Sequence, residues 1–134
     1  FIGDLEDNRI PDENKFLMNE TEQLTKNNKK LNLVFAFNYG SRKEIHDAYT
    51  KLNKNSIDQL DEESFRANLL LPEMPDPDLL IRTAGEKRVS NFLLYQLSYT
   101  ELMFVDTLWP DFDEKELDSA VDEFQNRVRK YGNA

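Results

Sequence analysis

The chain has 134 residues, enough for one domain with a sizeable core, and 39% of them are hydrophobic and 32% charged. Its formal net charge of -9 argues against nucleic-acid binding and against a general attraction to anionic membranes. The sequence contains no cysteine, which excludes disulfide bonds and thiolate chemistry, and no apolar run approaches the ~20 residues that span a bilayer.

The first predicted element is a helix between Pro11 and Asn28, with a thin apolar face. Residues 31–37, LNLVFAF, are apolar on both faces from the third residue on, which is typical of a central parallel strand. Gly40 interrupts this strand. Ser41 then begins a predicted helix, and Glu44 follows at the spacing of a capping box. The pattern therefore predicts a buried strand followed closely by a helix.

The middle of the chain alternates in the same way. Residues 61–70 are predicted as a short helix, and three prolines between positions 72 and 77 form a stiff, extended connector. A short apolar strand, Leu79–Ile81, follows this connector. Residues 90–99 form the next predicted helix, which is apolar nearly all round and should therefore be buried. Residues 102–105 are predicted to return as a strand.

The last predicted helix has the clearest end signals. Asp113 and Glu116 have the spacing of a capping box, and Gly132 is placed to end the helix. An apolar stripe at helical spacing joins these ends: Leu117, Val121, Phe124, Val128 and Tyr131. Three cations fall in the final turn, where they complement the helix dipole: Arg127, Arg129 and Lys130. The whole pattern predicts an α/β fold, a parallel β-sheet of about four strands flanked by helices, without an internal domain boundary.

The loop after the strand at Leu79–Ile81 carries two arginines, a glycine and a glutamate. Ligands of α/β folds bind at the carboxyl ends of strands, so Arg82, Arg88 and the helix start at Ser90 indicate an anion site. Guanidinium groups beside the N–H groups of a helix start suit a phosphate or diphosphate. The alternative is that the arginines are solvated or paired with Glu86, as is common on protein surfaces.

Two other charged residues have more than one interpretation. Arg42 lies in the first turn of a predicted helix, an unfavourable place for a cation, so either an anion lies near it or Glu44 or Asp47 is its partner. Glu101 is a lone carboxylate, which the sequence by itself predicts to be solvated. The only histidine, His46, has no nucleophile beside it and is assigned no catalytic role. No nucleophile–base pair or zinc spacing occurs in the sequence.

Several stretches together carry a family resemblance. The longest is DLLIRTAGEKRVSNFLLYQLSYTEL at residues 78–102, followed by WPDF at residues 109–112. Residues 1–4, FIGD, residues 38–42, NYGSR, and the basic tail at residues 127–132 add to it. These motifs resemble the cis-prenyltransferases, the undecaprenyl diphosphate synthase family. The family's phosphate loop of the DGNGRWA type and its ENW loop have no counterpart here, so residues 1–134 are expected to be the C-terminal half of that domain.

The resemblance implies that Arg82, Arg88 and Ser90 hold the diphosphate of isopentenyl diphosphate, with Glu86 and Arg42 as supporting residues. Enzymes of this family ionise an allylic diphosphate such as farnesyl diphosphate and add isopentenyl units in cis to make a long, undecaprenyl-type polyprenyl diphosphate. No catalytic residue is assigned, because the family's catalytic aspartate belongs to the half without a counterpart. The 134-residue chain alone is therefore expected to be inactive.

The resemblance also implies Mg²⁺ as cofactor, with Glu101 as its ligand, and a homodimer in the cytoplasm with a peripheral contact at the membrane. A second interpretation is a non-catalytic partner subunit or interaction module of a two-subunit prenyltransferase. Such partners generally lose the isopentenyl-binding arginines, so the presence of Arg82 and Arg88 favours the catalytic type. One departure is Lys130 in the tail, where the family often has an arginine that reaches the neighbouring active site; lysine weakens that role because it is a point charge.

Overall fold

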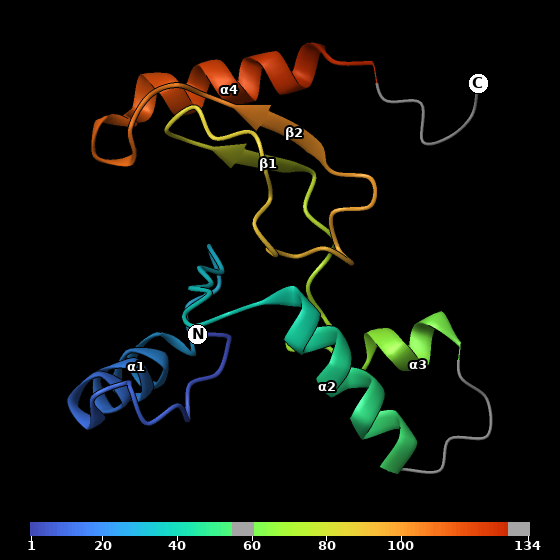
Figure 1. The fold of residues 1–134 in the computed structure, drawn as a ribbon. Coiled ribbons are helices and arrows are strands. Elements are labelled where there is room, and N and C mark those ends of the chain that lie inside the picture. Colours follow the sequence, from blue (N-terminus) through green and yellow to red (C-terminus); the bar gives the residue numbers. More distant parts are fainter. Residues whose placement is uncertain (55–60, 129–134) are drawn as a thin grey trace. The chain divides into compact units, whose positions relative to one another are not determined.

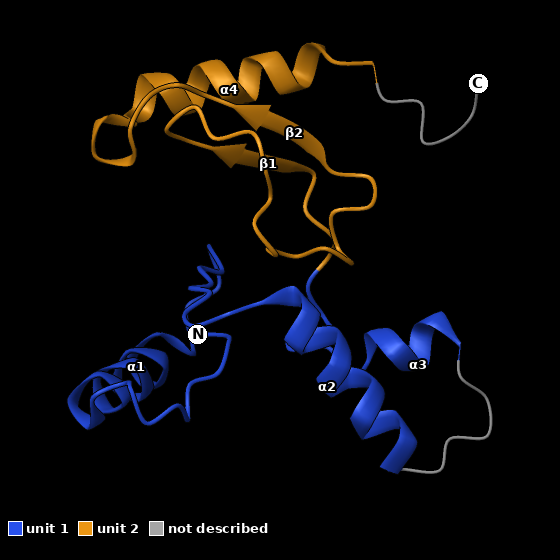
Figure 2. Cartoon of the chain, in the orientation of Figure 1, with its two compact units in different colours: residues 1–74 blue, residues 75–134 orange. Residues whose placement is uncertain are grey.

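The computed structural model describes residues 1–54 and 61–128 (Figure 1). Its contacts gather in two compact units, unit 1 at Phe1–Met74 and unit 2 at Pro75–Ala134 (Figure 2). The division lies inside the proline-rich connector, a point at which the sequence showed no domain boundary. The assignment of all 134 residues to one portion of a single domain stays a prediction.

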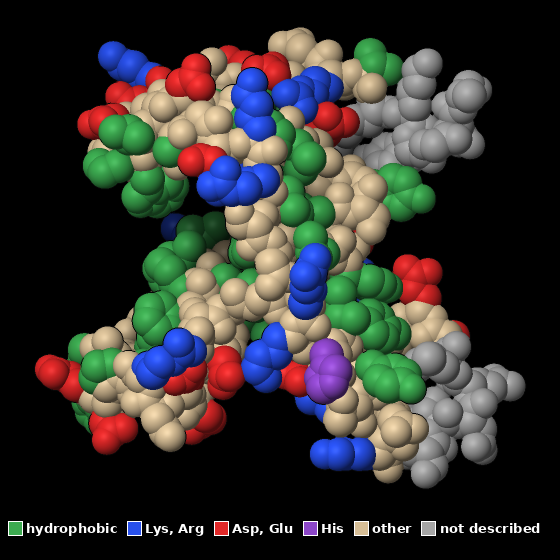
Figure 3. Space-filling view, viewed as in Figure 1, with side chains coloured by type: hydrophobic (Ala, Val, Ile, Leu, Met, Phe, Trp, Pro, Cys, Tyr) green, Lys and Arg blue, Asp and Glu red, His purple; other side chains and the backbone are tan. Residues whose placement is uncertain are grey.

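Unit 1 begins with helix α1, Asp12–Thr25, which confirms the first predicted helix. Pro11 precedes it, and Asp12 and Glu13 lie in its first turn, where acidic groups are favourable. No residue of α1 is buried, in keeping with its thin apolar face. Large hydrophobic side chains also lie at the surface elsewhere in the described chain, as the space-filling view shows (Figure 3).

Helix α2, Ser41–Lys54, begins at the predicted residue. The Glu44 carboxylate, which is buried, accepts hydrogen bonds from the Tyr39 hydroxyl at 2.6 Å and the Leu70 N–H at 3.0 Å. Ala48 and Leu52 are also buried and lie one and two turns further along the same face of the helix. This face anchors α2 in the small core of unit 1.

Helix α3, Glu62–Arg66, lies beside α2 (Figure 1). Asp61 caps it: the Asp61 carboxylate accepts from the Ser64 N–H at 2.8 Å, and the Ser64 hydroxyl accepts from the Asp61 N–H at 3.1 Å. These hydrogen bonds, those from Ser64 above all, lower the pKa of Asp61. The short predicted helix is therefore present, although it ends earlier than residue 70.

The central strand predicted at residues 31–37 does not form a strand of a sheet. Among the described residues, its pairing is a parallel bridge between Ala36 and Ile2. The bridge is made by hydrogen bonds of 2.9 Å from the Ile2 N–H to the Phe35 carbonyl and 2.8 Å from the Phe37 N–H to the Ile2 carbonyl. The large side chains are exposed, by 76% at Leu31 and 68% at Leu33. The prediction of a buried strand is wrong here, because burial requires neighbours that the described residues do not supply.

Unit 2 is built on two parallel strands, β1 at Leu79–Arg82 and β2 at Glu101–Phe104 (Figure 1). The register pairs Leu79 with Glu101 and Arg82 with Phe104. Both strands occur within one residue of their predicted positions, and their parallel pairing confirms the α/β class. The prediction of a sheet of about four strands is not met by the described residues, which form this pair and the separate bridge of unit 1.

Residues 90–99, predicted as a buried helix, form a series of turns instead. Ser90, Asn91 and Leu93 have φ values of 46°, 64° and 46°, which a right-handed helix does not contain. Phe92 is 39% exposed and Tyr99 72% exposed. The helix prediction is therefore wrong. A helix that is apolar all round depends on packing from every side, and in the described part of unit 2 only Met103 and Ala120 are buried hydrophobic residues.

After β2 the chain forms a short 3₁₀ helix, η1 at Trp109–Asp111, and then helix α4, Glu114–Asn126. Asp113 caps α4 as predicted, because its carboxylate accepts from the Lys115 and Glu116 N–H groups at 2.9 Å and 3.1 Å. The helix ends at Asn126, six residues before Gly132, the predicted end. Gly132 lies outside the described residues, and so do Arg129, Lys130 and Tyr131.

The predicted apolar stripe of α4 is only partly covered. Ala120 is the one buried residue of the helix, Leu117 is 46% exposed, and Val128, beyond the helix end, is 85% exposed. None of the helices in residues 1–54 and 61–128 combines the length and the apolar character that crossing a bilayer requires.

Candidate functional site

The loop after β1 is fixed against the end of β2. The Val105 N–H donates to the Arg82 carbonyl at 2.9 Å, and the Gly85 N–H donates to the Val105 carbonyl at 2.9 Å. Gly85 has a φ of 65°, a conformation that favours glycine, and a Cβ there would lie 3.1 Å from Asp106 Oδ1. These contacts hold the loop at the carboxyl end of the parallel pair, where α/β folds bind ligands.

The structure brings two of the predicted site residues together in this loop. Arg82 Nη1 donates to Ser90 Oγ at 2.9 Å and also to the carbonyl oxygen of Arg88. The guanidinium group therefore ties the two ends of the loop at residues 83–89. Ser90 lies in a turn and not at a helix start, so the backbone N–H groups of a helix do not contribute to the site that the sequence predicted.

Arg88 has a different partner in the same loop. Its Nη1 forms an ion pair with Glu86 Oε2, the alternative that the sequence analysis left open. Both side chains are in contact with solvent, with 62% of Arg88 and 42% of Glu86 exposed. An exposed pair of this kind contributes about 0–1 kcal/mol, so a more highly charged anion can displace Glu86 from Arg88.

A hollow of about 270 Å³ opens beside these residues. Four of its lining residues are apolar and two are polar: Leu80, Ile81, Val89 and Phe92, with Arg82 and Ser90. An apolar wall with a guanidinium and a hydroxyl group fits a small ligand that has a short hydrocarbon part and an anionic head. The volume is slightly below the usual range of drug-sized pockets, about 300–1,000 Å³, and therefore indicates a small ligand.

Glu101, the predicted metal ligand, does not belong to this group of residues. It opens β2 and pairs in register with Leu79, so it lies at the amino end of the sheet, whereas Arg82 lies at the carboxyl end. At about 3.3 Å per residue, the two ends of a four-residue strand are roughly 10 Å apart. The Glu101 carboxylate therefore does not contact Arg82 and has other partners.

Arg127, which directly follows α4, supplies those contacts. Its guanidinium donates to Glu123 Oε1 at 2.5 Å, to Glu101 Oε2 at 3.0 Å and to the Leu102 carbonyl at 3.1 Å. The hydrogen bonds to Glu123, and then to Glu101, raise the pKa of Arg127. This side chain is 27% exposed and ties the end of α4 to the start of β2. The sequence analysis placed Arg127 in the basic tail and beside the helix dipole, and it missed this role.

The Arg127→Met variant, which keeps much of the side-chain volume, is expected to lower the free energy of unfolding by about 2 kcal/mol, between the values for exposed and buried ion pairs. It leaves the Glu101 carboxylate, 28% exposed, without its cation. Urea denaturation followed by circular dichroism measures the loss. The control is Glu123→Gln, for which about 0.5 kcal/mol is expected because Glu123 is 59% exposed. Equal losses in the two variants would contradict a special role for the contact with Glu101.

The described residues do not by themselves fit a magnesium site. No group of three or more His, Cys, Asp or Glu side chains that could hold a metal ion occurs in residues 1–54 and 61–128. Mg²⁺ requires several oxygen ligands in octahedral geometry, and Glu101 offers a single carboxylate that already pairs with Arg127.

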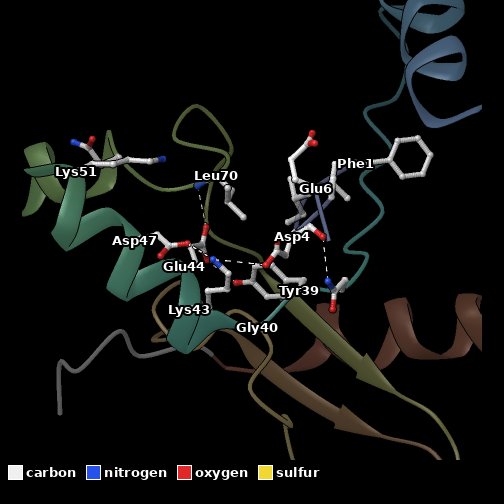
Figure 4. Close-up of a pocket in the computed structure, with 15 residues that line it drawn as sticks. Phe1, Asp4, Glu6, Tyr39, Gly40, Lys43, Glu44, Asp47, Lys51 and Leu70 are labelled. Atoms are coloured by element: carbon white, nitrogen blue, oxygen red, sulfur yellow. Dashed lines mark hydrogen bonds and ion pairs between the residues drawn. The ribbon is translucent and has the colours of Figure 1, made fainter. Parts of the chain in front are cut away.

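A second hollow, of about 370 Å³, lies in unit 1 (Figure 4). Figure 4 shows Lys43 between two carboxylates: Lys43 Nζ lies 2.7 Å from Asp47 Oδ2 and 3.9 Å from Asp4 Oδ2. The hydrogen bond from Lys43 lowers the pKa of Asp47, and the same bond raises the pKa of Lys43.

Arg42, predicted as a supporting residue, is exposed in the first turn of α2 and belongs to unit 1. Arg82, Arg88 and Ser90 belong to unit 2.

The sequence did not predict this hollow, although two of its motifs meet there. Asn38 Nδ2 donates to the Asp4 carbonyl at 3.0 Å, and the Asp4 N–H donates to the Asn38 carbonyl at 3.1 Å. The FIGD and NYGSR stretches are therefore joined directly. Their shared family resemblance was the available signal that they could belong to one site.

Comparison with known proteins agrees with the motifs. The family described as "Putative undecaprenyl diphosphate synthase" matches residues 1–132. The chain belongs to this prenyltransferase family. It is 48% identical over 125 residues to an isoprenyl transferase of Fusobacterium nucleatum, a match that covers 93% of this chain and 54% of that protein.

A relative with a more specific name is the ditrans,polycis-undecaprenyl-diphosphate synthase ((2E,6E)-farnesyl-diphosphate specific) of Micrococcus luteus. The identity is 45% over 137 residues, with 98% of this chain and 54% of the relative covered. The chain thus spans about half the length of the curated relatives it matches. The predicted family is confirmed, and its limitation to the C-terminal half stays a prediction.

Two solved structures show the same fold. A probable undecaprenyl diphosphate synthase from Campylobacter jejuni has a TM-score of 0.86 and 38% identity, covering 98% of this chain and 61% of the other. Lavandulyl diphosphate synthase from Lavandula x intermedia, solved in complex with dimethylallyl diphosphate, has a TM-score of 0.91 and 36% identity, covering 98% and 58%. Both likenesses support the α/β class.

Proposed function

We propose that this chain contributes the isopentenyl diphosphate-binding part of a cis-prenyltransferase that makes a long, undecaprenyl-type polyprenyl diphosphate. The observation that carries the proposal is the contact between Arg82 and Ser90 at the carboxyl end of β1, beside a hollow with apolar walls. Membership of the prenyltransferase family supports the reaction class.

The loop supplies groups of the right chemistry for a diphosphate. Arg82 is a permanent cation, and Ser90 Oγ accepts a hydrogen bond from it, which leaves the hydroxyl proton of Ser90 to donate to a phosphate oxygen. Arg88 would exchange Glu86 for the diphosphate, and the apolar wall would receive the five-carbon chain. The work of these residues is positioning and electrostatic stabilisation, since they transfer no proton and form no covalent bond.

The allylic diphosphate, Mg²⁺, homodimer formation, and a cytoplasmic location with a peripheral membrane contact belong to the proposal as properties of the whole enzyme. Glu101 could serve Mg²⁺ only after Arg127 releases it, and further oxygen ligands would have to come from the substrate or from outside the described residues. We expect the 134-residue chain alone to show no turnover.

The second candidate function is that of a non-catalytic partner or interaction module of a two-subunit prenyltransferase. One observation favours it: Arg82 and Arg88 already have partners within their own loop, Ser90 and Glu86. This candidate predicts that Arg82 and Arg88 make only the internal contacts described above.

Calorimetric titration of the purified chain with isopentenyl diphosphate separates the two candidates. The catalytic candidate predicts one binding site, competition by inorganic pyrophosphate, and no binding of isopentenol, which lacks the charged head. A chain that binds none of the three would support the partner function. Product formation by the chain alone, measured with farnesyl diphosphate and Mg²⁺, would contradict the expected inactivity.

A further inference from the structure

The backbone of the loop after β1 holds Glu86 close to Arg88. On one side of Glu86, the Gly85 N–H donates to the Val105 carbonyl at 2.9 Å. On the other side, the carbonyl oxygen of Arg88 accepts a hydrogen bond from Arg82 Nη1. Glu86 therefore lies in a short segment that is anchored at both ends, and its carboxylate meets the Arg88 guanidinium group at a high effective concentration. The ion pair needs little further ordering to form.

The two arginines of this loop differ in the charge of their partners. Arg82 donates to the Ser90 hydroxyl and to the carbonyl oxygen of Arg88, and both of these acceptors are neutral. Arg88 instead donates to the Glu86 carboxylate, which offsets its positive charge. Arg82 therefore keeps its full charge for an anionic ligand, whereas Arg88 already holds an anion of the protein itself.

We propose that Glu86 is a specificity-determining residue, an internal competitor that makes the site prefer diphosphates to monophosphates. The inference rests on the proposed function, because it concerns the same anion site. A diphosphate has one phosphate group for Arg82 and a second for Arg88, so it can replace the Glu86 carboxylate. A monophosphate held by Arg82 has no second group for Arg88, and the carboxylate that remains there repels it.

The apolar wall of the hollow cannot make this distinction. Isopentenyl diphosphate and isopentenyl monophosphate have the same five-carbon chain, so Leu80, Ile81 and Val89 would contact both ligands in the same way. Selectivity between two such ligands can come from a group that disfavours one of them. Glu86 is the one acidic residue in the sequence of the loop at residues 83–89, and it is therefore the group that can act in this way.

Other roles for Glu86 predict different results. If the ion pair only orients Arg88 for the ligand, removal of the carboxylate would weaken the binding of a diphosphate. If Glu86 acts only through the net charge of the protein, its removal would favour the more highly charged diphosphate. An ordinary surface ion pair would affect both ligands equally or not at all. The competitor predicts tighter binding of both ligands, with the larger gain for the monophosphate.

The test is calorimetric titration of the original chain and of the Glu86→Gln variant with isopentenyl diphosphate and isopentenyl monophosphate. Glutamine keeps the size of the side chain and removes its charge. The monophosphate should bind the variant about 20-fold more tightly, because it gains a hydrogen bond to a charged group. The diphosphate should gain only about threefold, the amount that an exposed ion pair contributes. The preference for the diphosphate should therefore fall about fivefold or more.

Asp118→Asn is the matched control. Asp118 is an exposed residue of α4 in the same unit, so this substitution also removes one negative charge. The ratio of the two affinities should stay within about twofold of that of the original chain, because charges in solvent are screened over a short distance. The Glu86 side chain is 42% exposed, so both variants should keep the thermal midpoint of the original chain.

The salt dependence of diphosphate binding gives an independent measurement. In the original chain, sodium chloride weakens the contact of the ligand with Arg88 and also the competing contact of Glu86. The two effects partly cancel. The affinity for isopentenyl diphosphate should therefore fall more steeply with salt in Glu86→Gln than in the original chain. An equal salt dependence in the two proteins would contradict the competition.

The outcomes separate this inference from the proposed function. An unchanged ratio of the two affinities, a larger gain for the diphosphate, or weaker binding of the diphosphate by Glu86→Gln would overturn the role of Glu86 and leave the proposed function intact. If the original chain binds neither isopentenyl diphosphate nor inorganic pyrophosphate, the proposed function fails, and the inference fails with it.

Discussion

Arg82→Ala is expected to weaken the binding of isopentenyl diphosphate about 100-fold, which corresponds to the loss of a charged hydrogen-bonding group at an anion site. The substitution removes a permanent cation from the carboxyl end of β1. It also releases Ser90 and the Arg88 carbonyl, the two groups that Arg82 holds in the structure. Calorimetric titration of the purified chain measures the change in affinity.

Two further variants give this prediction its controls. Arg82→Lys keeps the charge but loses the planar fork, so an intermediate loss of about tenfold is expected. Lys87→Ala removes an exposed cation from the same loop and should change the affinity by less than about threefold. A site in which Lys87 matters as much as Arg82 would respond only to the total charge of the loop, and the proposed diphosphate clamp would then be wrong.

Gly3→Ala is expected to lower the free energy of unfolding by about 3 kcal/mol, through backbone strain and steric overlap together. Gly3 has a φ of 130°, and a Cβ there would lie 1.9 Å from the carbonyl oxygen of Phe37. That oxygen belongs to the backbone and cannot rotate away. The chain must therefore move apart at this point, which breaks the bridge between Ile2 and Ala36. Urea denaturation of the variant and the original chain measures the difference.

Gly85→Ala is the matched control, because Gly85 also has a positive φ, of 65°, but a much more open surrounding. Its Cβ would meet only Asp106 Oδ1, the end of a flexible side chain, at 3.1 Å. About 1 kcal/mol of destabilisation is expected there. Equal losses of unfolding free energy in Gly85→Ala and Gly3→Ala would mean that the positive φ alone determines the effect. The close approach of Gly3 to the Phe37 carbonyl would then be irrelevant.

The elements that the sequence predicted correctly depend on local signals. Asp113 caps α4 through bonds to residues two and three positions away, and the prolines before β1 leave a short apolar run that forms the strand. The strand predicted at residues 31–37 and the helix predicted at residues 90–99 were wrong for a common reason. An apolar run shows that a segment needs to be covered, but the identity of its neighbours depends on the rest of the fold, and that determines whether a strand or helix forms.

In the candidate site, too, one contact could be predicted from the sequence and another could not. The closeness of Arg82 and Ser90 followed from the general placement of ligand sites at the carboxyl ends of parallel strands. The pairing of Arg127 with Glu101 joins residues 26 positions apart, and each had a sufficient local explanation, so no pattern in the sequence connected them. Side-chain partners at this range are determined by packing and are visible only in the structure.

The two arginines of the loop after β1 should affect ligand binding differently. Arg82 is already ordered by the Ser90 hydroxyl and the Arg88 carbonyl, so an arriving anion does not have to immobilise it, a saving of about 0.5–1.5 kcal/mol of side-chain entropy. Arg88 must first leave an exposed carboxylate, an exchange that dissolved salt assists by screening the ion pair. Ionic strength should therefore change the affinity for the anionic ligand mainly through Arg88. The affinity that remains in concentrated salt should depend mainly on the ordered guanidinium group of Arg82.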